Sequence, residues 1–313
     1  MANVSVISTM KNEAESVTEF LESLLGQSRK PDEILIVDGG SIDGTREVIQ
    51  RFAGKNALIK MIVVEGANIS QGRNVAIQNS EYDIIASADA GCRIHEKWLE
   101  NIVKPLEKDR TVDVVAGFYL PNSKTILEAS VAALAFPRLE KIDPDKFLPS
   151  SRSIAFRKDA WKKVGGYPEW LYTAEDTLFN IRLKEAGCKF VFAPDAIVYW
   201  RPRASLGGFF KQCYLYAKGD GEAGLFTKNY LKRLAQYLVA FALLVIGVRL
   251  RLFWFLLAFF VVIRLAVCCF LAYRSLEKSI AILLIPPLVI LKDFAEMLGF
   301  LRGALNRIVR PKS

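Results

Sequence analysis

Residues 34–45 have the sequence ILIVDGGSIDGT, and this stretch decides the fold. A β-branched, uncharged run ends at Asp38, glycines follow, and Asp43-Gly44-Thr45 is suited to cap the next helix. The same alternation of a short apolar run with a helical pattern extends from VSVIS at residues 4–8 to VDVVAGF at residues 112–118. Strands that are continuously apolar are buried on both faces, and helical connections make neighbouring strands parallel. We therefore expect an α/β fold with a Rossmann-like, mostly parallel sheet and helices on both faces.

The positive charge of the chain is concentrated toward its C-terminal end. The 313 residues are 52% hydrophobic, which is too apolar for a disordered chain. Residues 231–313 hold 12 Lys and Arg against 3 Asp and Glu, a net charge of +9, whereas residues 1–230 hold 30 of each sign. A nucleic-acid-binding protein carries its basic excess on a folded face, but here the basic residues alternate with long apolar runs, as in membrane proteins. We expect membrane lipids, and no nucleic acid, among the partners.

The cysteine and histidine content excludes several classes of protein. The five cysteines show no metal-binding spacing, and His95 is the only histidine. A structural zinc site, a disulfide framework, a multi-histidine metal site and a Ser-His-Asp hydrolase are therefore disfavoured. The first residues show no apolar stretch followed by a cleavage site, so we expect the first domain to stay in the cytoplasm with reduced thiols.

The apolar runs of the C-terminal part predict a membrane tail. We expect a domain at residues 1–230 and a tail at residues 231–313, with spans at about 233–250 and 252–273. A third apolar segment, at about 279–301, contains Pro286-Pro287 and is re-entrant, interfacial or spanning, so that two or three spans remain open. These features predict a multi-pass protein of the cell membrane, and the sequence leaves its oligomeric state open.

Basic residues near the C-terminal end predict the orientation of the tail. Arg302, Arg307, Arg310 and Lys312 belong in the cytoplasm by the positive-inside rule, which places both ends there if two spans form. Arg264, inside the second run, could meet an anionic lipid head group.

Two polar segments follow the first two predicted strands, where ligands bind in sheets of this kind. They are Thr9 to Glu13 and Asp38 to Thr45. A carboxylate at a strand end followed by glycines can accept hydrogen bonds from a base or a ribose. We interpret Asp38 as a ligand contact, and Asp43 and Thr45 as parts of a turn and helix cap.

These motifs, in this order, resemble the inverting family 2 glycosyltransferases of GT-A type. The similarity includes VSVISTMKNE, ILIVDGGSIDGT and GANISQGRNVAIQNSEYDIIASADAG, and extends through AFRKDAWKKVGGYPEWLYTAEDTLFNIRLKEAG over about residues 3–221. The resemblance implies a GT-A-type domain that binds a nucleotide-sugar donor. It assigns donor contacts to Thr9, Glu13, Asp38 and Arg73, of which Arg73 could also be a solvated helix charge.

The resemblance also bears on a metal cofactor. Its D-x-D element normally holds a divalent metal, Mg or Mn, against the diphosphate, but here it reads Asp89-Ala90-Gly91. Asp89 with waters could still bind magnesium, so metal dependence is in doubt because Gly91 replaces the second acidic residue. Arg201 and Arg203 could neutralise the diphosphate directly, or could form a basic collar against anionic lipid.

The segment TAEDTLFNIRLKEAG carries the candidate base. From the residues alone, Glu175 and Asp176 suit a helix N-terminus, whereas the resemblance makes Asp176 the general base and Glu175 the alternative. Trp161 could stack on the acceptor sugar or belong to the core. By position only, Gln212 and Tyr216 would lie near an acceptor head group.

Together these points predict an inverting, hexosyltransferase-like enzyme. It would move a sugar from a nucleotide-diphosphate sugar to a hydroxyl acceptor, lipid-linked, at the cytoplasmic membrane face. The alternatives are a non-catalytic nucleotide-sugar-binding module of a glycan-assembly complex and a polyprenyl-phosphate glycosyltransferase. A nucleotidyltransferase is disfavoured because STMKNEA lacks a phosphate-binding glycine loop, and a dehydrogenase because no GxGxxG follows the first strand.

Overall fold

The computed structural model of the chain describes residues 2–273 and 279–309. They form two compact units. The first consists of Met1–Asn122 with Pro137–Arg201, and the second of Ser123–Phe136 with Pro202–Ser313. The compact units thus divide near residue 202, while the functional boundary near residue 230 stays a prediction.

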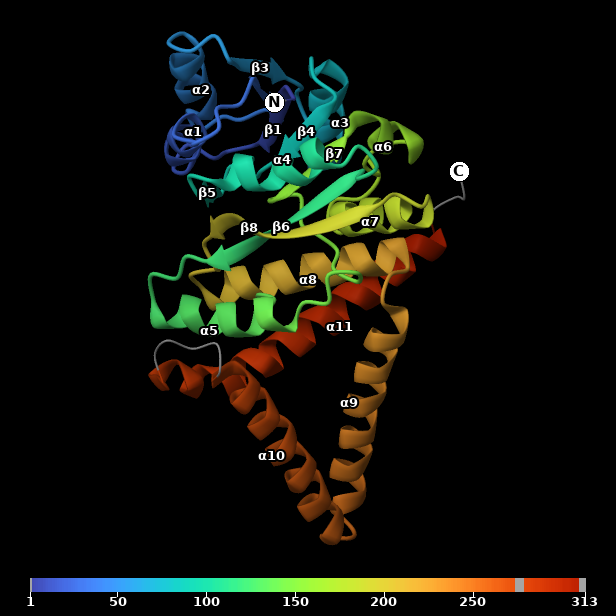
Figure 1. The fold of residues 1–313 in the computed structure, drawn as a ribbon. Coiled ribbons are helices and arrows are strands. Elements are labelled where there is room, and N and C mark those ends of the chain that lie inside the picture. The colour runs from blue at the N-terminus through green and yellow to red at the C-terminus, as the bar shows by residue number, and fades with distance from the viewer. Residues whose placement is uncertain (1, 274–278, 310–313) are drawn as a thin grey trace. The chain divides into compact units, whose positions relative to one another are not determined.

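The first unit is built on one eight-stranded sheet with the order β3-β2-β1-β4-β7-β6-β8-β5 (Figure 1). The strands are β1 (Val4–Met10), β2 (Glu33–Asp38), β3 (Ile59–Val63), β4 (Ile84–Ser87), β5 (Cys92–Ile94), β6 (Val114–Pro121), β7 (Ile154–Arg157) and β8 (Phe190–Trp200). The half from β3 to β4 is parallel throughout. In the other half β6 and β8 are parallel, but β7 runs antiparallel to β4 and β6, and β5 runs antiparallel to β8. The α/β prediction is confirmed, with a mixed sheet.

Helices cover both faces of this sheet, as the apolar strands predicted. The helical elements of the first unit are α1 (Val17–Leu25), α2 (Thr45–Ala53), α3 (Ile69–Asn79), α4 (Trp98–Lys108), η1 (Leu139–Lys141), α6 (Lys158–Lys163) and α7 (Glu175–Glu185). Alternate residues of β2 enter different cores: Ile34 and Ile36 pack with residues of α1 and α4, and Leu35 and Val37 pack with residues of α3 and α7. Both faces of the central strands are therefore buried under apolar side chains.

The strand register brings the polar segments to one edge. Met10 lies opposite Asp38 in the pairing of β1 with β2, and Ile7 lies opposite Ser87 in the pairing of β1 with β4. The segments that follow Met10, Asp38 and Ser87 therefore leave the sheet side by side, at the carboxyl ends of parallel strands.

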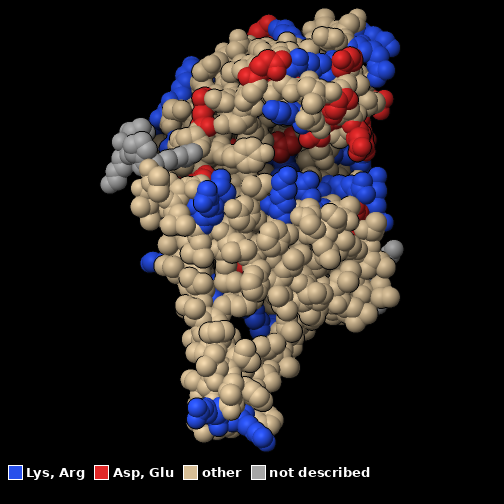
Figure 2. Space-filling view, turned by 180° about the vertical axis from the view of Figure 1, so that it is seen from behind, with Lys and Arg blue, Asp and Glu red and all other residues tan. Residues whose placement is uncertain are grey.

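The second unit is helical. Its elements are α5 (Ile126–Ala135), α8 (Leu206–Ala223), α9 (Thr227–Gly247), α10 (Leu252–Tyr273), η2 (Ser279–Leu284) and α11 (Ile285–Val309). By length and composition α9 and α10 could each cross a membrane, and few of their residues are buried. The two helices diverge from a shared turn (Figure 1), and Figure 2 shows a largely uncharged hairpin with basic side chains at its tip. Arg249 and Arg251 lie in this turn.

The third apolar segment forms α11, which packs along α8. Pro286 and Pro287 lie in its first turn, where their missing N–H groups break no helical hydrogen bond. A Cβ atom at Gly299 would lie 2.1 Å from the carbonyl oxygen of Tyr214, and one at Gly303 would lie 2.0 Å from that of Lys218. The two backbones therefore meet through glycines spaced four residues apart. The number of spans stays a prediction, and Arg310 and Lys312 lie outside the described residues.

A cluster of charged residues joins α9, α10 and α11. Asp293, which is 3% exposed, forms ion pairs with Arg264 and Arg233 and accepts a hydrogen bond of 2.8 Å from the Tyr237 hydroxyl. Arg233 also pairs with Glu296. Arg264 thus has a protein partner, which is the usual state of a charge in an apolar helix. The five cysteines of the chain are free thiols.

Candidate active site

A buried arginine organises the carboxylates at the strand-end edge of the first unit. Arg73 lies in α3, which begins with a capping box formed by Asn68 and Gln71. Its Nη1 donates to Oε1 of Glu175 at 2.8 Å, and its Nη2 donates to Oδ1 of Asp89 at 2.9 Å. Burial alone would lower the pKa of Arg73, but these two carboxylates outweigh it and raise the pKa. Three residues that are far apart in the sequence therefore form one ionic network.

The two acidic residues that begin α7 have different environments. Glu175 is 6% exposed, and its burial, reinforced by the charge of Asp176, raises its pKa to about 7 against the opposing effect of Arg73. Asp176 is half-buried, and its carboxylate accepts hydrogen bonds from the backbone N–H of Thr177 at 2.7 Å and of Ser151 at 3.4 Å. Asp176 is partly exposed whereas Glu175 is buried against Arg73, so Asp176 is the better placed of the two to meet a substrate.

The backbone before this pair is strained. Ala174 has a φ of 64°, in the left-handed region that a residue with a Cβ atom rarely adopts. Strained backbone conformations of this kind persist where the surrounding fold imposes them, and they concentrate at functional sites. Ala174 is the residue directly before Glu175, so this strained position lies at the N-terminus of α7.

A second arginine, Arg152, also contacts Asp89, and sequence reasoning missed it. Its Nε lies 3.6 Å from Oδ2 of Asp89, and its guanidinium carbon lies 4.0 Å from the ring centroid of Trp200. Arg152 precedes β7, so a parallel sheet would place it at the opposite edge. Because β7 is antiparallel to β4, with Ile154 opposite Ser87, the start of β7 lies beside the end of β4. Knowing the direction of β7 would have located Arg152 at this edge, but a run of apolar residues does not indicate the direction of a strand.

The residues after β1 also lie at this edge. Oγ1 of Thr9 is buried and makes no hydrogen bond within the described part of the chain. A Cβ atom at Gly72 would lie 2.7 Å from Cγ2 of Thr9, so the glycine of α3 allows the helix to approach β1 closely. Glu13 is half-buried and accepts a hydrogen bond of 2.6 Å from the Ser16 hydroxyl.

Asp38 is held by the turn that follows it. Its carboxylate is fully buried and accepts hydrogen bonds from the N–H groups of Gly40 and Ser41 and, at 2.7 Å, from Nε of Arg46. Burial alone would raise the pKa of Asp38, but these hydrogen bonds outweigh it and lower the pKa. Asp38 is therefore an ionised anchor of the turn, and its contact with a donor nucleotide stays a prediction.

Asp43 and Thr45 occupy the positions expected for a turn and helix cap. Oδ1 of Asp43 accepts a hydrogen bond of 3.1 Å from the N–H of Thr45, and Oγ1 of Thr45 accepts one of 2.8 Å from the N–H of Glu13. These bonds fix the second polar segment against the first.

Arg73, Asp89 and Arg152 lie in the region that matches a known family, and Glu175 and Asp176 follow it. Residues 5–165 match the model for glycosyl transferase family 2. The chain belongs to this family. It is therefore a glycosyltransferase, and transfer of a sugar from a nucleotide sugar is the reaction that its relatives support.

Named family 2 relatives cover most of the chain. Glycosyltransferase AglE of Haloferax volcanii is 28% identical over 236 residues, which are 74% of this chain and 77% of AglE. Poly-beta-1,6-N-acetyl-D-glucosamine synthase of Staphylococcus aureus (strain COL) is 23% identical over 245 residues, which are 74% of this chain but only 58% of that enzyme. The chain therefore spans less than two thirds of the synthase.

A solved structure supports the fold. The mannosyltransferase PcManGT of Pyrobaculum calidifontis, solved in complex with GDP-Man and Mn2+, matches with a TM-score of 0.59 at 19% identity. The match covers 98% of this chain and 87% of that chain. It supports the GT-A-type architecture of a family 2 enzyme.

The family 2 resemblance raises the question of a divalent cation, and the residues present do not fit one. Asp89 is the one acidic residue of the D-x-D element, and each of its oxygens faces an arginine. Gly91 has no side chain, and within residues 2–273 and 279–309 no three His, Cys, Asp or Glu residues gather as metal ligands. Magnesium is usually held by one or two carboxylates together with waters and substrate phosphates, and both oxygens of the one acidic residue here are already paired with arginines.

The remaining predicted residues have different positions. Trp161 is 8% exposed and packs in the core, and it donates from Nε1 to Oδ1 of Asn74 at 2.9 Å. Arg201 is exposed directly after β8. Arg203, Gln212 and Tyr216 belong to the second unit, where Nε2 of Gln212 donates to the Tyr216 hydroxyl at 3.3 Å. Their roles toward a diphosphate or an acceptor stay predictions.

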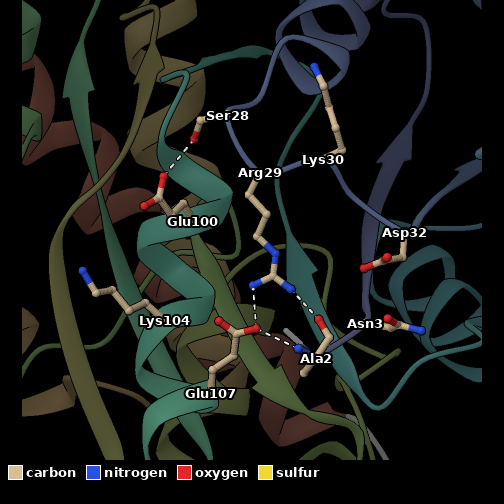
Figure 3. Close-up of a pocket in the computed structure, with 9 residues that line it drawn as sticks. All are labelled: Ala2, Asn3, Ser28, Arg29, Lys30, Asp32, Glu100, Lys104 and Glu107. Atoms are coloured by element: carbon tan, nitrogen blue, oxygen red, sulfur yellow. Dashed lines mark hydrogen bonds and ion pairs between the residues drawn. The ribbon is translucent and has the colours of Figure 1, made fainter.

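A cavity of the first unit lies elsewhere. It has a volume of about 490 Å³ and is lined by residues next to the amino ends of β1 and β2 and by one side of α4. Figure 3 shows Arg29 directed toward Glu107 and the backbone of Ala2, so that its charge is already paired. Because α/β sheets of this kind bind ligands at the carboxyl ends of the strands, the network around Arg73 is the better candidate for the active site.

Proposed function

We propose that this family 2 enzyme is an inverting glycosyltransferase that transfers a sugar from a nucleotide-diphosphate sugar to a hydroxyl of a lipid-linked acceptor at the cytoplasmic membrane face. The observation that carries the proposal is the contrast between Asp176 and Glu175. Asp176 is half-buried beside the edge where the strands end, whereas Glu175 is buried against Arg73. One carboxylate can therefore act on a substrate while its neighbour supports the arginine.

Asp176 acts as the general base. The acceptor oxygen attacks the anomeric carbon from the face opposite the diphosphate, and the bond from that carbon to the diphosphate oxygen breaks. The electron pair of the broken bond leaves with the nucleoside diphosphate, and the acceptor proton moves to Asp176. The attack from the opposite face inverts the configuration of the anomeric carbon.

The residues after β1, β2 and β4 hold the donor. Thr9, Glu13 and Asp89 are the donor contacts at this edge, where Glu13 and Asp89 offer carboxylate oxygens to ribose hydroxyls. Asp38 acts at the same edge, where it shapes the glycine turn that faces the nucleotide. Arg73 aligns Asp89 and Glu175 rather than contacting the donor, since it is 2% exposed.

The helices of the second unit support a position of the enzyme at a membrane. The lengths and compositions of α9 and α10 support two spans, because about 20 apolar residues cross the hydrocarbon core. Arg249 and Arg251 at the turn would then lie at the far interface, where arginine side chains can reach the polar head groups. An acceptor carried on a lipid fits an enzyme held at the bilayer surface.

Turnover of base variants tests the catalytic part. The assay measures nucleoside diphosphate release from a panel of nucleotide sugars with a membrane lipid extract, alongside donor binding by calorimetry. Asp176→Asn should lower turnover by about 10² to 10⁴ at nearly unchanged donor affinity, and Glu175→Gln should lower it less. Asp159→Asn is the matched control, since Asp159 also lies in the first turn of a helix but is exposed.

Two outcomes would contradict this assignment. Wild-type turnover in Asp176→Asn with acceptor-dependent release would indicate a phosphate acceptor, which is already ionised and needs no base. Release that does not depend on any acceptor would contradict transfer itself. Recovery of the full chain in the soluble fraction after a carbonate wash would contradict the membrane part.

A further inference from the structure

The surroundings of Asp89 contain two cations where a D-x-D site would contain two anions. Oδ1 of Asp89 accepts from Arg73, and Oδ2 lies 3.6 Å from Nε of Arg152. Gly91 is exposed, and a Cβ atom built on it meets nothing within 4 Å. The second carboxylate is therefore missing without any steric reason. Positive charge at this edge is supplied by side chains.

We propose that Arg152 takes the place of the divalent cation and binds the donor diphosphate. This inference rests on the proposed function, because it concerns the leaving group of the same reaction. When the bond to the anomeric carbon breaks, the diphosphate oxygen gains the electron pair, and a fixed cation beside it stabilises the charge that develops. A guanidinium can donate two parallel hydrogen bonds to phosphate oxygens.

Arg152 suits this role better than Arg73 does. Both terminal nitrogens of Arg73 are engaged with carboxylates, and its side chain is 2% exposed. The side chain of Arg152 is 17% exposed, and its contact with Asp89 is longer by 0.7 Å than the 2.9 Å contact of Arg73. Nη1 of Arg152 donates to the neutral hydroxyl of Ser150 at 2.9 Å. A phosphate oxygen is a stronger acceptor than that hydroxyl.

Aromatic residues hold the guanidinium in place. Its carbon lies 4.0 Å from the ring centroid of Trp200 and 5.7 Å from that of Tyr119. A cation against the face of a tryptophan is attracted by the ring. Arg152 is thus preorganised, as a charge-stabilising group must be.

The position of Arg152 along the chain links the two sides of the reaction. The preceding residue, Ser151, donates its backbone N–H to Oδ2 of Asp176 at 3.4 Å. Arg152 itself contacts the donor-side carboxylate Asp89. The bond that breaks lies between the diphosphate and the carbon attacked by the oxygen that Asp176 deprotonates. A segment that touches both carboxylates therefore passes beside that bond.

Calorimetric binding of nucleotides to the full chain in detergent tests the proposal. The probes are UDP and GDP, each compared with its nucleoside, with EDTA present or with added Mn2+. We expect the wild-type chain to bind a diphosphate equally well in EDTA. Arg152→Gln should weaken diphosphate binding by about ten- to a hundredfold, as expected for a lost charge-assisted hydrogen bond, and should leave nucleoside binding unchanged. Arg152→Lys should retain part of the affinity.

The controls separate this role from a structural one. Arg51→Gln, an exposed arginine of α2, should bind diphosphate as the wild type does, and thermal unfolding should show that each variant is folded. In Arg152→Gln combined with Gly91→Asp, Mn2+ should restore diphosphate binding and EDTA should abolish it, because the added carboxylate has open space beside Asp89.

Three results would overturn the proposal. They are loss of wild-type diphosphate binding in EDTA with recovery in Mn2+, wild-type diphosphate affinity in Arg152→Gln, and no effect of Mn2+ on the combined variant. Failure of the wild-type chain to bind any nucleotide or nucleoside would instead overturn the proposed function.

Discussion

The buried ionic network around Arg73 differs from the one around Asp293 in what surrounds it. In the first unit, Arg73 joins Asp89 and Glu175. In the second unit, Asp293 joins Arg233 and Arg264. Each network connects three separate elements through one central charge. A buried ion pair is weak evidence for function by itself, so the comparison depends on the neighbouring groups.

The neighbours of the first network are arranged for chemistry. Asp176 is half-buried next to it, Ala174 is strained, and Arg152 lies on the other side of Asp89. The second network is completed by the Tyr237 hydroxyl and by Glu296, which pairs with Arg233. A partly exposed carboxylate beside the network distinguishes the candidate active site from the network that joins three helices.

Removing the central charge of the first network should have the largest effect. Arg73→Gln leaves Glu175 and Asp89 without their cation, and removing one partner of a buried ion pair costs about 3 to 5 kcal/mol. We expect a lower midpoint of thermal unfolding in detergent together with loss of glycosyl transfer. Arg51→Gln should change neither quantity, and an Arg73→Gln protein that keeps its stability would contradict the network.

The centre of the second network should affect stability without affecting chemistry. Asp293→Asn removes the charge shared by two arginines, and we expect a loss of about 2 to 4 kcal/mol. Turnover per folded molecule should stay at the wild-type level in the same assay. A fall in turnover at unchanged stability would show that the second network belongs to the catalytic machinery.

The close contact between α8 and α11 predicts a smaller change in stability. Gly303→Ala places a methyl group 2.0 Å from the Lys218 carbonyl oxygen, which must force α8 and α11 apart. Overpacking of this kind costs about 1 to 3 kcal/mol. The expected result is a lower unfolding temperature in Gly303→Ala and no change in Gly207→Ala, where a Cβ atom meets nothing within 4 Å. Equal stability of the two variants would refute the close contact.

The smallest expected effect is a change in the pH dependence of stability, caused by the raised pKa of Glu175. The folded-state pKa of Glu175, about 7, is above its ordinary value of 4.5. Between these values the folded chain binds more protons than the unfolded chain, so this group makes stability fall as pH rises from about 4.5 to 7. Glu175→Gln should flatten that slope by on the order of 1 to 3 kcal/mol, as measured by denaturant unfolding at several pH values. A slope that persists in the variant would contradict the assignment.

Local patterns predicted the first half of the sheet, for a physical reason. Apolar runs such as that of β2 are buried whatever surrounds them, and the polar segments after β1, β2 and β4 must meet once those strands are parallel. The motifs around Asp38, Asp89 and Asp176 are likewise contiguous, so the resemblance could locate them. The C-terminal apolar helices were detectable because spanning length and composition are properties of one segment.

Other features depend on contacts between distant segments, and only the tertiary structure decided them. The reversed direction of β7 brings Arg152 to Asp89, and neither the residues of β7 nor their spacing encodes that direction. Trp161 is buried against Asn74, and Arg264 pairs with Asp293. Each contact joins residues that are far apart along the chain. The sequence by itself determined β1 to β4 and β6, which helices are apolar and which family the motifs resemble, since these depend on adjacent residues. Glu175 and Asp176 differ in burial, and the burial of a side chain depends on the whole fold.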